Sequence, residues 1–158
     1  MSSHNPGVRL RVVTDDDLPV LFEHQRDPVS NAMAAFPAKE RDAFFAHWAK
    51  IRRDAATWVR TVLVGDDVAG MILSFERGGE RLLGYWIGRE FWGRGVASAA
   101  LAEFLTVLPV RPVFAHVATH NGASRRVLEK CGFVLSVELT DTLPPPDDGV
   151  EEWVFRLD

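Results

Sequence analysis

The residues with the clearest chemical potential lie in a short loop, Gly93-Arg94-Gly95, that follows an expected strand and precedes an expected helix. Glycine lets the backbone turn and lets a ligand approach it closely. The start of a helix presents unpaired amides and a partial positive charge, and Arg94 would add a full charge. The loop therefore predicts an anion site, most naturally for a pyrophosphate, although an ordinary strand-to-helix turn is the alternative interpretation.

Two common phosphate loops do not fit this stretch. A P-loop needs a Gly-Lys-Ser/Thr sequence, and none follows Gly95. A dinucleotide fingerprint needs a third glycine and an acidic residue at the end of the next strand, and both are missing here.

The segment Trp92-Gly93-Arg94-Gly95-Val96-Ala97 is similar to the acetyl-CoA loop of the GNAT superfamily of N-acetyltransferases, at its Gly and Gly/Ala positions. Together with Tyr85-Trp86 and Phe91-Trp92, it resembles the ribosomal-protein alanine acetyltransferase branch (RimJ/RimL-like). A second segment, Asn121 to Phe133, resembles the family's Asn-x-x-Ser/Ala helix that ends in Gly-Phe. Two matches in the right order are more specific than either alone.

The resemblance implies an acetyl-CoA-dependent N-acetyltransferase that transfers the acetyl group directly to a primary amine. It also implies which residues hold the co-substrate. The pyrophosphate would lie on the loop, the pantetheine arm along the strand Leu82 to Ile87, and Asn121 at the mouth of the slot. The residues implied to bind acetyl-CoA are Trp86, Ile87, Gly88, Trp92, Gly93, Arg94, Gly95, Val96, Ala97, Ser98, Asn121 and Ser124, with help from Arg125 and Arg126.

The sequence indicates the general acid and the general base of the reaction less clearly than it indicates the acetyl-CoA site. Many relatives protonate the departing thiolate with a tyrosine at the position of Leu128, so Ser124 is the nearest substitute for that acid, and Tyr85 could reach the acetyl group. Each also has a plain structural interpretation, as a residue of a helix's first turn or as a buried sheet tyrosine. Glu76 is the expected base; His116, His120 and ordered water are alternatives. The resemblance places Met33 and Phe36 beside the acceptor.

Hydropathy patterns predict the elements that must position these residues. Strands are expected at 8–13, 58–64, 68–75, 82–87, 113–118, 133–143 and 150–157, and helices after Thr14, at 37–53, 98–108 and 121–130. Residues 28–37 are expected to be irregular, and 143–149 to form a long, stiff turn. The fold implied is α+β: a mixed, mostly antiparallel seven-stranded sheet, helices on both faces, and a splay between the fourth and fifth strands.

Length and composition limit the number of domains, the partners and the cellular location that we expect. A length of 158 residues suits one domain, 1–158, and a net charge of −4 disfavours nucleic-acid binding through a basic face. The lone Cys131 allows no internal disulfide, and the chain shows neither a membrane span, nor a signal-peptide pattern at Met1 to Gly7, nor a metal motif. We therefore expect a cytoplasmic enzyme acting on a small-molecule or peptide amine, with no nucleic-acid or membrane partner. The family also allows a homodimer. The rival hypothesis is a non-catalytic acyl-CoA-binding regulatory domain with the same fold.

Overall fold

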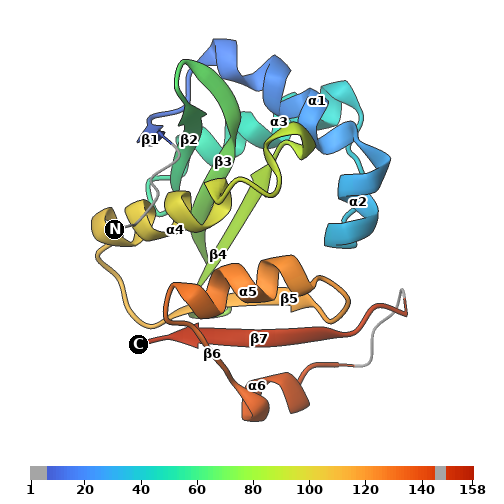
Figure 1. Ribbon diagram of the computed structural model, residues 1–158, viewed down its shortest axis with the longest axis vertical. Helices are drawn as coiled ribbons and strands as arrows, with labels where there is room; N and C mark the ends of the chain where they lie inside the picture. Colours follow the sequence, from blue (N-terminus) through green and yellow to red (C-terminus); the bar gives the residue numbers. More distant parts are fainter. Residues whose placement is uncertain (1–6, 145–148) are drawn as a thin grey trace.

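The sheet at the centre of the molecule has seven strands in the order β1-β2-β3-β4-β5-β7-β6 (Figure 1). This is a computed structural model, and it describes residues 7–144 and 149–158. The strands are β1 (Val8–Arg11), β2 (Trp58–Val64), β3 (Asp67–Arg77), β4 (Glu80–Ile87), β5 (Val113–Ala118), β6 (Val134–Leu135) and β7 (Glu152–Leu157). Every neighbouring pair is antiparallel except β4 and β5. The α+β fold with a mixed, mostly antiparallel sheet is confirmed.

The two halves of the sheet part at β4 and β5. Among the described residues, the pairing of these strands is confined to Arg81–Val113 and Leu82–Phe114. Beyond Leu82 the strands diverge, and Figure 1 shows β4 running steeply while β5 and β7 lie almost horizontally. The predicted splay between the fourth and fifth strands is therefore present, and it opens a gap in the middle of the sheet.

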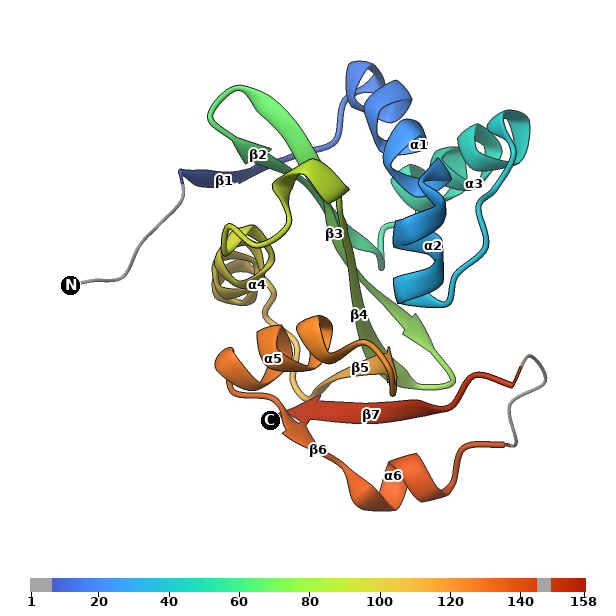
Figure 2. The same cartoon turned by 45° about the vertical axis from the view of Figure 1, so that its right-hand side comes forward.

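Helices cover both faces, because successive side chains of each strand point to opposite sides. Val62 and Ile72 pack in the same core cluster as residues of α4 (Val96–Val107) and α5 (Gly122–Lys130). Their neighbours Val59 and Leu73 pack on the other face, against α1 (Leu18–Arg26) and α3 (Arg41–Arg53). Figure 2 shows α1, α2 (Pro28–Ala34) and α3 grouped on the side of the sheet opposite to α4.

Two expectations about local structure are wrong. Residues 28–34, expected to be irregular, form α2: Pro28 occupies its first turn, and the Asp27 carboxylate accepts hydrogen bonds from Val29 N and Ser30 Oγ. In the stretch 133–143, strand β6 covers only two residues and is followed by the helix α6 (Val137–Asp141), which Ser136 caps. In both places a capping side chain favours a helix that the hydropathy pattern did not reveal.

The second expected helix is shorter than predicted, because α3 begins at Arg41 rather than Pro37. Two other expectations, the polar start at Met1 to Gly7 and the stiff turn at 143–149, fall largely on 1–6 and 145–148, outside the described residues.

A buried carboxylate joins the first strand, the 3-10 turn Asp15–Asp17 and β2. Asp17 is 2% exposed and accepts two hydrogen bonds from the Arg11 guanidinium, at 2.6 and 2.8 Å. It also accepts from Thr61 Oγ1 at 2.7 Å and from the Thr14 amide at 2.9 Å. Burial opposes ionisation, but these donors outweigh it and hold the pKa of Asp17 well below its usual range. Asp17 therefore fixes the edge of the sheet on which α1 and α3 pack.

Candidate functional site

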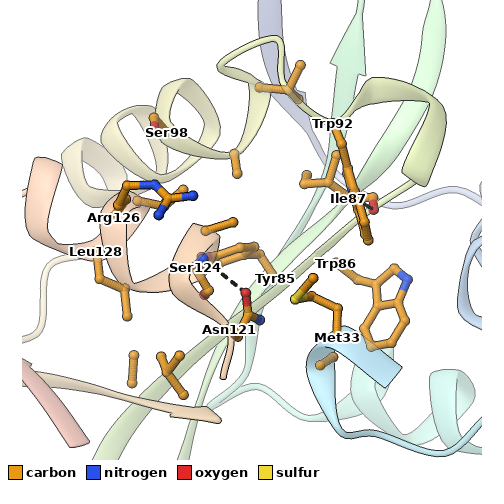
Figure 3. A pocket seen from close by; sticks show the side chains of 18 of the residues that line it. Met33, Tyr85, Trp86, Ile87, Trp92, Ser98, Asn121, Ser124, Arg126 and Leu128 are labelled. Carbon is orange, nitrogen blue, oxygen red and sulfur yellow. Dashed lines mark hydrogen bonds between the residues drawn. The ribbon is translucent and has the colours of Figure 1, made fainter. Parts of the chain in front are cut away.

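The gap between β4 and β5 is a cavity of about 660 Å³ (Figure 3). Its walls come from α2, β4, the loop after β4, the first turn of α4, β5, α5 and the start of β7. A cavity of this size can take up a large organic ligand. Segments far apart in the sequence thus meet where the sheet is open.

Strand alternation divides the lining into two sides. On β4, Leu83, Tyr85 and Ile87 pack in the cluster beneath α4 and α5, so Gly84 and Trp86 face the side of α1 and α2. On β5, Val117 packs in that same cluster, so His116 points the other way. All of these residues line the cavity. The cavity therefore passes through the sheet and opens toward both faces.

The backbone of β4 is also available to a ligand. Gly88 N donates to Ala69 O at 2.8 Å across the β3–β4 pair. Because the backbone groups of alternate residues point to opposite sides of an antiparallel strand, and the pairing with β5 ends at Leu82–Phe114, the amides of Tyr85 and Ile87 face the gap. An extended ligand that carries amides can pair with this edge as an added strand would.

Two contacts fix the end of β4. Trp92 Nε1 donates to Ile87 O at 2.9 Å and ties the following loop to the strand. Gly70, opposite Ile87, lies so near β4 that a Cβ there would clash with the backbone oxygen of Trp86. Only glycine allows this approach.

The end of the cavity beneath α4 is built to hold an anion. Gly93 and Gly95 adopt φ angles of 73° and 74°, and Gly95 is the residue at which α4 begins. The amides of the first helical turn, at Val96, Ala97 and Ser98, have no partner inside the helix. Beyond its chain neighbours, a Cβ on Gly95 would meet no described atom within 4 Å, so this space is open to a ligand.

Two cations of α5, Arg126 and Lys130, line this end of the cavity. Figure 3 shows the Arg126 side chain reaching toward α4 near Ser98. Arg94, from which the sequence predicted a charge contact, instead lies 5.3 Å over the ring of Phe91. Arg125 stacks on Trp153 at 4.6 Å. Lys130 was missed by the sequence analysis; its spacing of four residues from Arg126 on one helix was the available signal.

Polar side chains meet in the middle of the cavity. Tyr85 Oη and Ser124 Oγ lie 2.6 Å apart in a hydrogen bond, and the Ser124 amide donates to Asn121 Oδ1 at 3.1 Å. Figure 3 shows these three residues side by side. Burial raises the pKa of Tyr85 to about 12, although the bond to Ser124 opposes the shift. The tyrosine therefore stays neutral at physiological pH.

Leu128, which stands where relatives would carry a tyrosine, is 1% exposed on the same wall. The hydroxyl groups nearest to it on the cavity wall are those of Ser124, on α5, and Tyr85, on β4.

Glu76 lies away from this group. It pairs with Arg81 at 3.4 Å, and Arg81, only 7% exposed, also donates to Ala56 O at 2.8 Å. The register places Glu76 opposite Arg81 and Ile72 opposite Tyr85, so about 13 Å of strand separates the two positions. Glu76 neutralises a buried guanidinium, and the structure does not bring it to the cavity.

The part of the cavity that faces α1 and α2 is more apolar than the part beneath α4. Met33 lines the cavity beside Trp86 (Figure 3). Phe36, which is not part of the lining, packs edge-on against Trp86 with ring centroids 6.1 Å apart. Across from them, His116 Nδ1 lies 3.7 Å from Glu152 Oε1 of β7, and both residues line the cavity. Glu152 was missed, because only the β5–β7 register brings it beside His116.

Two further expected site residues, Gly88 and His120, lie outside the cavity wall. Gly88 is buried against His24, and His120 Nε2 contacts Ala32 O at 3.0 Å. Within residues 7–144 and 149–158 no cluster of three or more potential metal ligands occurs, and no helix there is long and apolar enough to cross a membrane.

Comparisons with known proteins agree with this architecture. The acetyltransferase (GNAT) domain family matches residues 8–134. A search of curated proteins found no match. Among solved structures, the chain is similar to the spermidine N-acetyltransferase of Vibrio cholerae in complex with CoA and spermine, at 21% identity over 96% of this chain and 94% of that one, with a TM-score of 0.77.

Two further structures show the same likeness. An acetyltransferase from Agrobacterium tumefaciens is 19% identical over 96% of this chain and 90% of that one (TM-score 0.77). An acetyltransferase from Thermus thermophilus is 19% identical over 95% and 96% (TM-score 0.74). At such identities the likeness establishes the fold, while the activity must be argued from the site.

Proposed function

The chain belongs to the GNAT acetyltransferase family, and from this premise we propose that it transfers an acetyl group directly from acetyl-CoA to a small primary amine. The observation that carries the proposal is the cavity through the sheet. It has an anion-binding end under α4, a hydroxyl pair at its centre and an apolar wall with one carboxylate on the opposite face.

Acetyl-CoA fits the α4 side of the cavity. We assign the pyrophosphate to the amides of Val96, Ala97 and Ser98, with Arg126 and Lys130 at the same end. The pantetheine arm carries two amides, which match the amide and carbonyl groups that β4 presents to the gap. The Asn121 side-chain amide can donate to the same arm, because its oxygen is engaged by the Ser124 amide.

The reaction follows from these positions. The amine nitrogen attacks the thioester carbon, a C–N bond forms, and the carbonyl oxygen gains negative charge. The amide of Ile87 faces this point, and one well-placed donor lowers such a barrier by about 3–4 kcal/mol. The C–S bond then breaks, and the sulfur leaves with the electron pair.

Tyr85 and Ser124 act on the leaving sulfur. With its pKa raised to about 12, the Tyr85 phenol keeps its proton and is able to donate it in the hydrogen bond to Ser124 Oγ. The Ser124 hydroxyl is then free to donate to the thiolate. Ser124 gives its proton to the sulfur and takes up a proton from the attacking nitrogen. Tyr85 and Ser124 therefore have the same protonation state after the reaction as before it.

The acceptor side favours an amine with a single positive charge. Of the described residues that line the cavity, Glu152 alone is acidic, whereas Met33 and Trp86 supply an apolar and aromatic surface. One carboxylate can balance one ammonium group, and an aromatic face attracts the same group. A polyamine would leave further charges without partners. We therefore propose an arylalkylamine-like acceptor, in a cytoplasmic enzyme.

A peptide with an N-terminal alanine is the second candidate acceptor. Trp92–Ala97 resembles the loop of the ribosomal-protein alanine acetyltransferase branch, and a peptide N-terminus also carries one ammonium group. The two candidates differ in the group attached to the amine, which is an apolar ring in the first and a polar backbone in the second.

A comparison of three amines tests the proposal. Thiol release from acetyl-CoA is measured with phenethylamine, an alanyl dipeptide amide and spermidine at equal concentration. We expect kcat/KM to be highest for phenethylamine and lowest for spermidine. Preference for the dipeptide would support the second candidate, and preference for spermidine would contradict the single-charge argument.

A further inference from the structure

His116 and Glu152 form a pair on the acceptor side of the cavity that acetyl-CoA binding does not use. His116 lies on β5 and Glu152 on β7, and both line the cavity on the side of Trp86. Val154 is the direct partner of His116 in the sheet, so Glu152, two residues earlier, is its diagonal neighbour on the same face. The pairing of β5 with β7 therefore fixes the position of His116 relative to Glu152.

The geometry selects one nitrogen of the imidazole. Nδ1 faces Glu152 Oε1 at 3.7 Å, and the two side chains are 24% and 46% exposed. The carboxylate favours a proton on Nδ1, so that Nε2 keeps its lone pair.

The reaction needs a proton acceptor at this place. An alkylammonium group with a pKa near 10.4 is almost entirely charged at neutral pH, and only the neutral amine can attack. The acceptor-side residues of β4 that line the cavity are Gly84 and Trp86, which cannot take a proton, and Glu76 of β3 lies outside the cavity, paired with Arg81. Histidine is the residue type suited to this task near neutral pH.

Other charged groups around His116 are engaged elsewhere. Arg156 of β7 stacks over Phe114 and pairs with Asp158, and His120 at the end of β5 contacts the backbone of α2. On α6, Glu138 and Asp141 are exposed, and neither lines the cavity. His24 of α1 is buried beside Glu90, outside the cavity wall.

We propose that His116, oriented by Glu152, is the base that removes the proton from the acceptor ammonium before attack. The N–H bond of the ammonium breaks, its electron pair stays on nitrogen, and the proton moves to Nε2 of His116. The neutral nitrogen then forms the C–N bond described above. This role rests on the proposed function, because it requires an amine acceptor in the same cavity.

The test compares two amines of similar shape, phenethylamine and its β,β-difluoro analogue, whose fluorines lower the pKa of the amine. We expect His116→Gln to lower kcat/KM for phenethylamine about 100-fold. With the difluoro analogue the loss should be at least fivefold smaller, because less of that amine needs deprotonation. Added imidazole should partly restore the rate of His116→Ala, and Glu152→Gln should lose less activity than His116→Gln.

Three measurements separate this role from a structural one. The Kd for CoA should be unchanged in His116→Gln, and kcat/KM of this variant should keep rising with pH up to the pKa of the amine, because only the neutral fraction of the amine then reacts. The control His47→Gln, which removes an exposed imidazole from α3, should match the wild type. Equal losses with both amines, together with no rescue by imidazole, would overturn the assignment of His116. A wild-type protein that binds CoA and acetylates no amine would instead overturn the proposed function itself.

Discussion

Replacing Gly95 with valine places a side chain in the space where the pyrophosphate is proposed to bind, and Gly79 offers a matched control. Both residues have left-handed φ angles, 74° and 81°, and at neither would a Cβ meet a described atom within 4 Å beyond its chain neighbours. Gly95 opens α4 at the cavity, whereas Gly79 lies in the turn between β3 and β4. The two variants thus share the same backbone cost and differ in their relation to the cavity.

The free-energy cost of holding valine in a left-handed backbone conformation is of the same order in both variants. A side chain in the left-handed region costs about 1–2 kcal/mol. For a chain of this length, that corresponds to a fall in Tm of roughly 2–8 °C. We expect both variants to fold and to show similar falls in a thermal unfolding scan.

The effect on CoA binding should separate them. Each hydrogen bond from an amide to a charged phosphate is worth about 1.5–3 kcal/mol, and the valine at 95 displaces at least one. Since about 1.4 kcal/mol is a factor of ten, the Kd for CoA should rise at least tenfold in Gly95→Val. By isothermal titration calorimetry, Gly79→Val should stay within twofold of the wild type. A Gly95→Val protein that binds CoA as tightly as the control would refute the assignment of the pyrophosphate to this loop.

Three further predictions concern the central pair and the sheet. In steady-state assays, Tyr85→Phe and Ser124→Ala should each lower kcat at least tenfold, and the double variant should lose little more, because the two act as one unit; additive losses would contradict this. Asp17→Asn should lower the free energy of unfolding by about 2–3 kcal/mol at pH 7. Because the folded pKa of Asp17 lies below the unfolded value, this difference should be present above about pH 5 and should shrink as the pH falls, as urea unfolding can measure. Gly70→Ala should lower the Tm far more than Gly84→Ala, whose Cβ would meet its nearest neighbour at an ordinary 3.6 Å; equal shifts would contradict the close approach.

The parts of the site that the sequence predicted are those fixed by local chemistry. Gly93 and Gly95 adopt the left-handed backbone for which glycine is needed, and Asn121 caps α5 with the side-chain oxygen that suits that position. Tyr85 and Ser124 were expected as separate candidates. Their hydrogen bond depends on how α5 packs beside β4, and no local sequence pattern predicts that packing.

The parts that the sequence did not predict depend on the pairing of distant segments. Glu152 lies beside His116 because of the β5–β7 register. Glu76 was expected at the site because it ends the strand before β4, but buried Arg81 holds it at the other end of that strand. The helix α2 was missed because the hydropathy pattern does not reveal it, although Pro28 in the first turn and the capping carboxylate of Asp27 are both compatible with a helix.

The proposed function requires that the protein transfer the acetyl group itself to an amine. The protein is incubated with isotope-labelled acetyl-CoA and phenethylamine, and the amine and the free thiol are quantified by mass spectrometry. We expect labelled N-acetyl amine and free CoA in equal amounts, with much less of both when Gly95→Val replaces the wild type at the same subsaturating acetyl-CoA concentration. A wild-type protein that binds CoA but leaves phenethylamine, the alanyl dipeptide amide and spermidine all unlabelled would contradict the proposed function.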